Sequence, residues 1–161
     1  DWSSDVCSSD LSALAATTSS TLVKLRGHKI DTIKSFPVVV TDDLESTSNS
    51  KGLAKILDSL NLTQDIDRLK NRQKSRSGKP RLRGRKTKTG KSLLLVVKDS
   101  KNLYKAARSL VGVDVVKAKD ISVLDLAPGA KPIRLSVFTK GAIEEIAKIK
   151  SPHLEVMVAN K

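Results

Sequence analysis

Segments rich in β-branched and apolar residues recur along this chain and predict strands. They lie at residues 36–40, 93–97, 113–116 and 134–138. The first two, FPVVV and LLLVV, are apolar almost throughout, which is typical of parallel strands buried on both faces. Pro37 fits the start of its strand, where a missing N–H donor is tolerated.

Between these segments, apolar residues recur three and four positions apart, as on one face of an amphipathic helix. The clearest such helix covers residues 53–60, and the same spacing predicts helices at 103–110 and 143–150. Residues 121–126 are either a turn or a short helix. Residues 154–158, after Pro152, are either a short edge strand or a terminal packing segment.

The part of the chain before the first strand also has a helical period, over residues 11–25. The Thr- and Ser-rich run at 17–21 is unfavourable inside a helix and predicts a break. Either Ser19 or Ser20 then caps a second short helix, and Gly27 ends it.

Strands that alternate with helices indicate an α/β fold, because each helix connects one parallel strand to the next. We therefore expect a Rossmann-like, three-layer domain with a mostly parallel sheet of about four strands. Residues 12–161 are expected to form this single domain, and a basic insertion covers about 64–92. The chain's 161 residues are enough for one hydrophobic core.

Almost all of the net charge of +13 lies within this insertion. Residues 68–91 contain twelve Lys and Arg and no Asp or Glu, whereas the rest of the chain is close to neutral, at +1. We call residues 68–91 the cationic arm. A near-neutral body with one such arm predicts binding to a polyanion, and nucleic acid is the leading candidate. Because unpaired like charges repel, we expect this arm to become ordered mainly on binding.

The conformation expected for the arm differs between its two halves. Residues 68–76 would gather basic side chains on one side either as a helix or as an extended chain. Glycines and Pro80 predict a non-helical second half. We expect an extended loop along which the following residues alternate: Lys79, Arg81, Arg83 and Arg85.

The first residues look foreign to the rest of the chain. Residues 1–11, DWSSDVCSSDL, resemble the translation of a sequencing adapter, and the chain has no initiator Met. We expect this segment to be disordered and leave it out of the fold prediction. Without it, the chain has neither Cys nor Trp, which excludes thiolate chemistry and zinc held by cysteines.

Composition and spacing argue against several other functions. Aromatic residues make up only 2% of the chain, too few for base-stacking platforms, so binding is expected to depend on phosphates and RNA shape. No apolar run has the length of a membrane span. Gly84 and Gly90 enclose five residues, whereas a phosphate-binding loop needs four. Neither His28 nor His153 has metal-ligand spacing.

One enzymatic alternative stays open. Asp42, Asp43 and Glu45 follow the first predicted strand, at the edge of the sheet where α/β enzymes often bind ligands. A small enzyme with Mg²⁺ at Asp42 and Asp43 would act on an anionic substrate held by the arm. The alternative explanation is an acidic cluster stabilised by a helix N-terminus.

The basic arm also carries a family resemblance. Residues 76–85, RSGKPRLRGR, resemble the basic R-x-G-K-x-x-x-R-G-R segment of the large-subunit ribosomal protein four family, in its archaeal and eukaryotic form. Further segments resemble that family in the same order: 12–17, 26–28, 39–45, 124–129 and 134–139. The family's amino-terminal part, with its extension toward the peptide exit tunnel, has no match here, so we interpret the chain as a truncated fragment.

The resemblance implies a structural component of the large ribosomal subunit, on cytoplasmic ribosomes, that binds large-subunit ribosomal RNA and neighbouring ribosomal proteins. It implies no catalysis, cofactor, metal, membrane, small-molecule substrate or homo-oligomer. A regulator that binds messenger RNA through the same arm is a further alternative. The main predicted RNA contacts are Arg72, Lys74, Arg76, Lys79, Arg81, Arg83, Arg85, Lys86, Lys88 and Lys91. Two weaker candidate patches are also predicted. The first comprises Arg26, His28 and Lys29. The second comprises Lys131 and Arg134, with Pro128 and Gly129.

Overall fold

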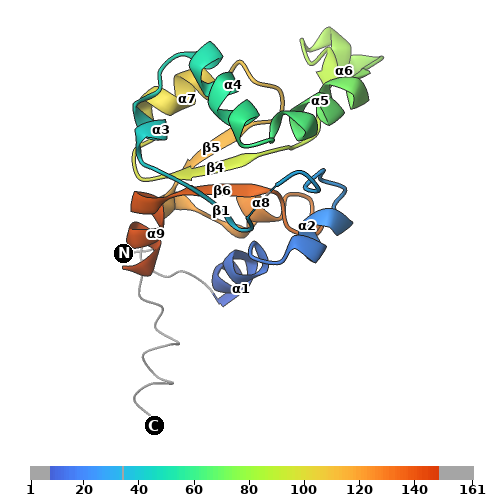
Figure 1. Ribbon diagram of the computed structural model, residues 1–161. Helices are drawn as coiled ribbons and strands as arrows, with labels where there is room; N and C mark the ends of the chain where they lie inside the picture. The colour runs from blue at the N-terminus through green and yellow to red at the C-terminus, as the bar shows by residue number, and fades with distance from the viewer. Residues whose placement is uncertain (1–7, 34, 149–161) are drawn as a thin grey trace, which may run out of the picture.

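A computed structural model describes residues 8–33 and 35–148 of the chain. Its centre is a four-stranded parallel sheet in the order β1-β6-β4-β5 (Figure 1). The strands are β1 (Val38–Val40), β4 (Leu94–Val97), β5 (Asp114–Lys117) and β6 (Ser136–Thr139). The predicted sheet of about four mostly parallel strands is confirmed.

Helices cover both faces of this sheet, which confirms the three-layer α/β architecture (Figure 1). On one face lie α3 (Asp43–Ser46), α4 (Ser50–Ser59), α5 (Thr63–Arg72) and α7 (Lys101–Ala107). On the other lie α1 (Ser8–Ala16), α2 (Ser20–Leu25), η1 (Ala118–Asp120), α8 (Val123–Leu126) and α9 (Lys140–Ala147). The 121–126 segment is therefore mainly a short helix, and residues 154–158 lie outside the described residues.

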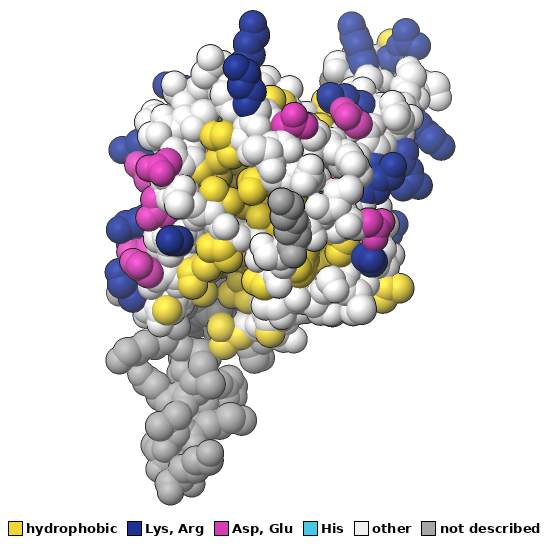
Figure 2. All heavy atoms as spheres, viewed as in Figure 1, with side chains coloured by type: hydrophobic (Ala, Val, Ile, Leu, Met, Phe, Trp, Pro, Cys, Tyr) yellow, Lys and Arg dark blue, Asp and Glu magenta, His cyan; other side chains and the backbone are white. Residues whose placement is uncertain are grey.

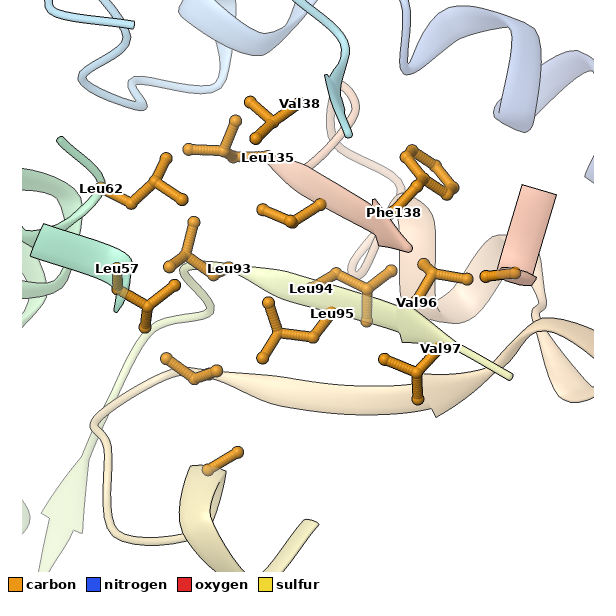
Figure 3. Packing of buried hydrophobic residues seen from close by; sticks show 14 of the residues in the cluster. Val38, Leu57, Leu62, Leu93, Leu94, Leu95, Val96, Val97, Leu135 and Phe138 are labelled. Atoms are coloured by element: carbon orange, nitrogen blue, oxygen red, sulfur yellow. The ribbon is translucent and has the colours of Figure 1, made fainter. Parts of the chain in front are cut away.

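Strand β4 forms the centre of the core. All four of its side chains, Leu94 to Val97, are fully buried. Leu95 is paired with Val137 of β6 on one side and Val115 of β5 on the other. Figure 3 shows how Leu and Val side chains from neighbouring elements pack around this strand. Each fully buried Val or Leu side chain contributes roughly 1.5–3 kcal/mol.

The predicted break between the first two helices is confirmed. Helix α1 ends at Ala16, and Ser19 is the extended residue before α2. Gly27 then leaves the helix with φ +91°. Helix α1 begins at Ser8, so the expected disorder of residues 1–11 does not hold for its last four residues: Asp10 accepts a 2.9 Å hydrogen bond from the Val123 N–H. The adapter origin of this segment stays a prediction.

The prediction that β1 is buried on both faces is wrong. Strand β1 is paired only with β6 and lies at the edge of the sheet. Val38 is buried, but Val39 is 44% exposed. The run of three valines indicates a strand, while its burial depends on a strand order that local sequence does not contain.

The basic insertion is folded, and its second half is not the extended loop that we predicted. Strands β2 (Lys74–Ser75) and β3 (Thr87–Lys88) form a short antiparallel ribbon. Between them α6 (Lys79–Leu82) makes one helical turn. Pro80 lies in the first turn of α6, where a missing N–H costs nothing, and Gly78 supplies the preceding positive φ of 67°. Both conformations predicted for residues 68–76 occur: the segment is helical up to Arg72, and Lys74 and Ser75 form a strand.

The base of the insertion packs closely against the start of β5. A Cβ added at Gly112 would lie 2.4 Å from Leu69 Cδ1 and 3.1 Å from the backbone oxygen of Gly90. We expect Gly112→Ala to destabilise the fold in urea by roughly 1–3 kcal/mol more than Gly129→Ala, because overpacking adds to the conformational strain. Gly129 has the same φ of +77° but no atom within 4 Å, which makes it the matched control. Equal losses would show that close packing at Gly112 has no role.

Candidate nucleic-acid interface

A cationic groove of about 400 Å³ lies where the insertion joins the body. Among the described residues, its lining includes no acidic side chain and no aromatic ring. It comprises Arg26, Arg68, Leu69, Arg72, Lys74, Lys88, Thr89, Gly90, Lys91 and Lys131. The groove therefore brings together several residues of the insertion and one residue from each of the two weaker predicted patches, Arg26 and Lys131. Figure 2 shows further Lys and Arg side chains gathered over the insertion, at the upper right of the view.

Most of the predicted contact residues are accessible. Nine of the ten predicted contacts in the insertion are exposed, and Arg76 is half-buried. Lys29 and Lys131 are also exposed, whereas Arg26 is half-buried. The tip of the insertion, from Arg81 to Lys86, lies outside the groove lining. The basic surface thus has two parts, which are a projecting tip and a concave groove at its base.

Two of the predicted contact residues are buried, which corrects their assignment. Arg134 is 1% exposed and His28 is 5% exposed. Neither side chain reaches the surface that a phosphate would approach. Their charge or polarity in the sequence indicated binding, but both have internal hydrogen-bond partners that lie far away along the chain.

His28 belongs to a buried network centred on the carboxylate of Asp65, which is fully buried. His28 Nδ1 lies 2.9 Å from Asp65 Oδ2, and the Ser92 hydroxyl donates to the same oxygen. Arg68 Nε donates to Oδ1 at 2.8 Å, and the Lys29 N–H donates to it at 3.2 Å. This carboxylate therefore connects the segment after α2, helix α5 and Ser92, which lies two residues before β4.

The network also sets the charge of Asp65. Burial raises the pKa of this carboxyl group, but hydrogen bonds from His28 and Arg68 and the nearby imidazole outweigh burial. Its pKa therefore lies well below the usual range. Because the ionised carboxylate only accepts, His28 Nδ1 donates to it, and His28 Nε2 is buried without a partner among the described residues.

Arg134 forms a second buried centre close to the first. Its guanidinium donates to the backbone oxygens of Ser92, Leu93 and Gly112. Its Nη1 lies 2.7 Å from Asp114 Oδ2, which also accepts from Lys91 Nζ at 2.7 Å. Arg134 thus joins the ends of three strands at the base of the insertion.

The pKa values here follow from the same contacts. Burial lowers the pKa of Arg134, and the charge of Asp114 opposes that shift. Burial raises the pKa of Asp114, but Lys91 and Arg134 outweigh it, so the pKa of this carboxyl group is lowered. Asp114 therefore stays ionised and holds Lys91 at the groove.

The acidic edge predicted as an alternative magnesium site lies at the other end of the strands. Asp42 Oδ1 accepts from the Gly141 N–H at the start of α9, at 2.8 Å. Glu45 accepts from the N–H groups of Lys98 and Asp99 at 2.8 and 3.0 Å. Both carboxylates are bound by backbone donors, and the Asp42 contact lies at a helix N-terminus, as the alternative explanation requires. Across residues 8–33 and 35–148, no three His, Cys, Asp or Glu side chains gather in a metal-binding cluster.

Sequence reasoning missed Asp65, Ser92 and Arg68 as residues that shape the surface. Arg68 follows Asp65 by three positions on one helix, which is a recognisable ion-pair spacing. Ser92 and His28 lie 27 and 37 residues from Asp65, so no local signal connects them.

Among the described helices, none has the length and apolar character required to cross a bilayer.

The fold and this surface define an α/β domain with a cationic insertion built around a concave groove. The chain belongs to the ribosomal protein L4/L1 family, whose sequence profile matches residues 11–149. This match confirms the family resemblance predicted from the basic motif.

Curated relatives agree with this assignment. The chain is 44% identical over 135 residues to the large ribosomal subunit protein uL4 of Saccharolobus islandicus, a match that covers 83% of this chain and 51% of the relative. It is 43% identical over 137 residues to uL4 of Methanococcus aeolicus, covering 85% and 54%. For uL4 of Sulfurisphaera tokodaii the identity is 40% over 139 residues, covering 86% and 52%. The chain therefore spans about half the length of these relatives.

We expect Asp65→Asn to lower the free energy of unfolding by about 3–5 kcal/mol, because it removes the charge that pairs with buried His28 and Arg68. Asp67→Asn is the matched control. Asp67 lies on the same helix and is also paired at 2.8 Å, with Lys70, but both side chains are more than half exposed. Its loss should cost about 0–1 kcal/mol. Similar urea midpoints for the two variants would contradict a central role for Asp65.

The lowered pKa of Asp65 also predicts an acid-dependent loss of stability. Above about pH 5 the carboxyl group is ionised in both the folded and unfolded states, so it contributes no slope. Below the unfolded pKa of about 3.9, the unfolded state binds the proton first, and stability falls. We expect chemical unfolding between pH 5 and pH 3 to show a steeper decline for the wild-type chain than for Asp65→Asn. A parallel decline would assign the acid sensitivity to other carboxylates.

Proposed function

We propose that this chain is an rRNA-binding part of a structural component of the large ribosomal subunit, located on cytoplasmic ribosomes. The names of its relatives support the ribosomal role. The observation that carries the binding role is the groove, where seven Lys and Arg from four segments line one concavity and no acid from the described part of the chain joins them. Neighbouring ribosomal proteins are further proposed partners.

The proposed mechanism is neutralisation of RNA phosphates. Arg side chains donate two parallel hydrogen bonds to a phosphate, while Lys acts as a point charge. Binding releases the counterions of the phosphates it neutralises, so affinity falls as salt rises. The groove lining offers no aromatic ring on which a base would stack. Discrimination between RNAs then depends on the shape of the backbone.

The role is structural, and we propose no catalysis, cofactor, membrane contact, small-molecule substrate or homo-oligomer. The carboxylates of Asp42 and Glu45 at the opposite edge are already engaged by backbone donors. No contact favours a magnesium enzyme there over a structural cluster.

We expect a variant with Gln at Arg81, Arg83 and Arg85 to bind large-subunit rRNA more weakly and with a flatter salt dependence. Each lost phosphate contact reduces the slope of log K against log salt by roughly 0.7–0.9, so the loss is about 2–3 in total. All three side chains are exposed, and titrations at several salt concentrations measure the change. A messenger RNA of equal length tests whether the same arm prefers ribosomal RNA.

The control variant carries Gln at Lys51, Lys55 and Lys105, three exposed residues on α4 and α7. It removes the same total charge from another surface. An equal effect of both variants, or unchanged binding by the arm variant, would reject the tip of the insertion as part of the proposed site.

A further inference from the structure

The groove differs from the tip of the insertion in how its cations are arranged. At the tip, basic side chains project from a single short segment, whereas the groove collects them from parts of the chain that are distant in sequence. Arg26 follows α2, Lys131 precedes β6, and the others come from α5, the ribbon and the segment after β3. Cations thus surround the concavity from several directions.

The floor of the groove is held in place by internal contacts. Arg68, whose side chain is 13% exposed, is fixed by Asp65 at 2.8 Å. Lys91 is paired with Asp114 at 2.7 Å, although its side chain is half exposed. Arg26 donates to the backbone oxygens of Pro132 at 2.6 Å and Pro128 at 3.0 Å. A ligand that enters therefore meets side chains whose positions are already set, which reduces the entropy cost of binding.

The charge at this floor is not fully compensated. Partial burial, followed by the positive charges of Arg134 and Arg68, lowers the pKa of Arg26. Arg26 has no acidic partner among the described residues. A concave, low-dielectric surface lined by one sign of charge focuses its potential into the groove.

The rim, in contrast, is free to adapt. Arg72, Lys74, Lys88 and Lys131 are exposed, and none forms an ion pair within the described part of the chain. Lys74 and Lys88 are paired across the two-stranded ribbon, while Lys131 reaches the groove from a loop of the body. The groove is therefore bounded by cations from both the insertion and the body.

This arrangement favours one shape of polyanion. The backbone of a regular duplex presents its phosphates on a convex surface, so one strand meets the rim but leaves the floor empty. At a sharp turn of an RNA strand, successive phosphates come together, and their mutual repulsion requires cations on several sides. We propose that the groove binds a sharp turn of the RNA backbone, whose clustered phosphates contact Arg26 and Arg68 at the floor and Lys74, Lys88 and Lys131 at the rim.

This inference rests on the proposed RNA-binding function and adds the shape of RNA that the groove selects. The test compares two RNAs of equal length and charge, a regular duplex and a stem interrupted by a loop with a sharp backbone turn. The full 161-residue chain is used in three forms. These are the wild type, a groove variant with Gln at Lys74, Lys88 and Lys131, and the tip variant with Gln at Arg81, Arg83 and Arg85.

We expect the wild type to prefer the turned RNA. The groove variant should lose about tenfold in affinity for that RNA, as after the loss of several phosphate contacts, and markedly less for the duplex. The tip variant should weaken both RNAs to a similar degree. Inorganic tripolyphosphate, as a compact cluster of phosphates, should compete with the turned RNA on the wild type and lose that effect on the groove variant.

The outcomes separate the two proposals. Binding of both RNAs with equal affinity, or equal losses for the two RNAs in the groove variant, overturns the selection of a turn and leaves the RNA-binding function intact. Absence of binding to either RNA overturns the proposed function, and the inference with it. Urea midpoints equal to the wild type confirm that the exposed substitutions leave the fold unchanged.

Discussion

The carboxylate of Asp65 is the interaction on which the cationic surface depends. A buried carboxylate is costly unless it is paired and hydrogen-bonded, and Asp65 has donors from His28, Lys29, Arg68 and Ser92. Within the insertion, Asp65 lies just before the basic run of residues 68–91 and Ser92 lies just after it. Their hydrogen bond therefore closes the insertion at its base and fixes where both ends leave the body.

Closure at the base allows the rest of the insertion to remain highly charged. Twelve cations on 24 residues repel one another, and a chain of this composition would otherwise be disordered. The short β2–β3 ribbon and the packing of Leu69 against Gly90 and Gly112 bring the charged segments back to the sheet. Asp65 and Asp114 balance the cations at the base and leave those at the tip and rim uncompensated. The cations at the base are therefore held by acidic partners, whereas the cations at the tip and rim are available to bind a polyanion.

The sequence predicts the local elements well because their signals are local. The apolar run of β4, the helical spacing of α4 and the break before Ser20 are all found in the structure. The exposure of Val39 depends on strand order, which no local pattern contains. Pro80 predicts a non-helical segment from local sequence, yet it lies where a helix begins, a position that a proline also fits. The burial of His28 and Arg134 depends on partners in distant segments, so their charge or polarity alone indicated the wrong location.

The choice of polar residues at the base has a geometric explanation. Well-packed apolar side chains at these positions would often be as stabilising as a buried ion-pair network. Apolar side chains would not, however, hold a guanidinium or an ammonium group at a fixed place on the surface. Asp65 places Arg68 and Asp114 places Lys91 at the groove, while buried Arg134 keeps Asp114 in position from below. The buried charges of Asp65 and Arg134, together with half-buried Asp114, therefore act by positioning cations at the groove, and this explains why a domain of modest size keeps these charged side chains at the base of its binding surface.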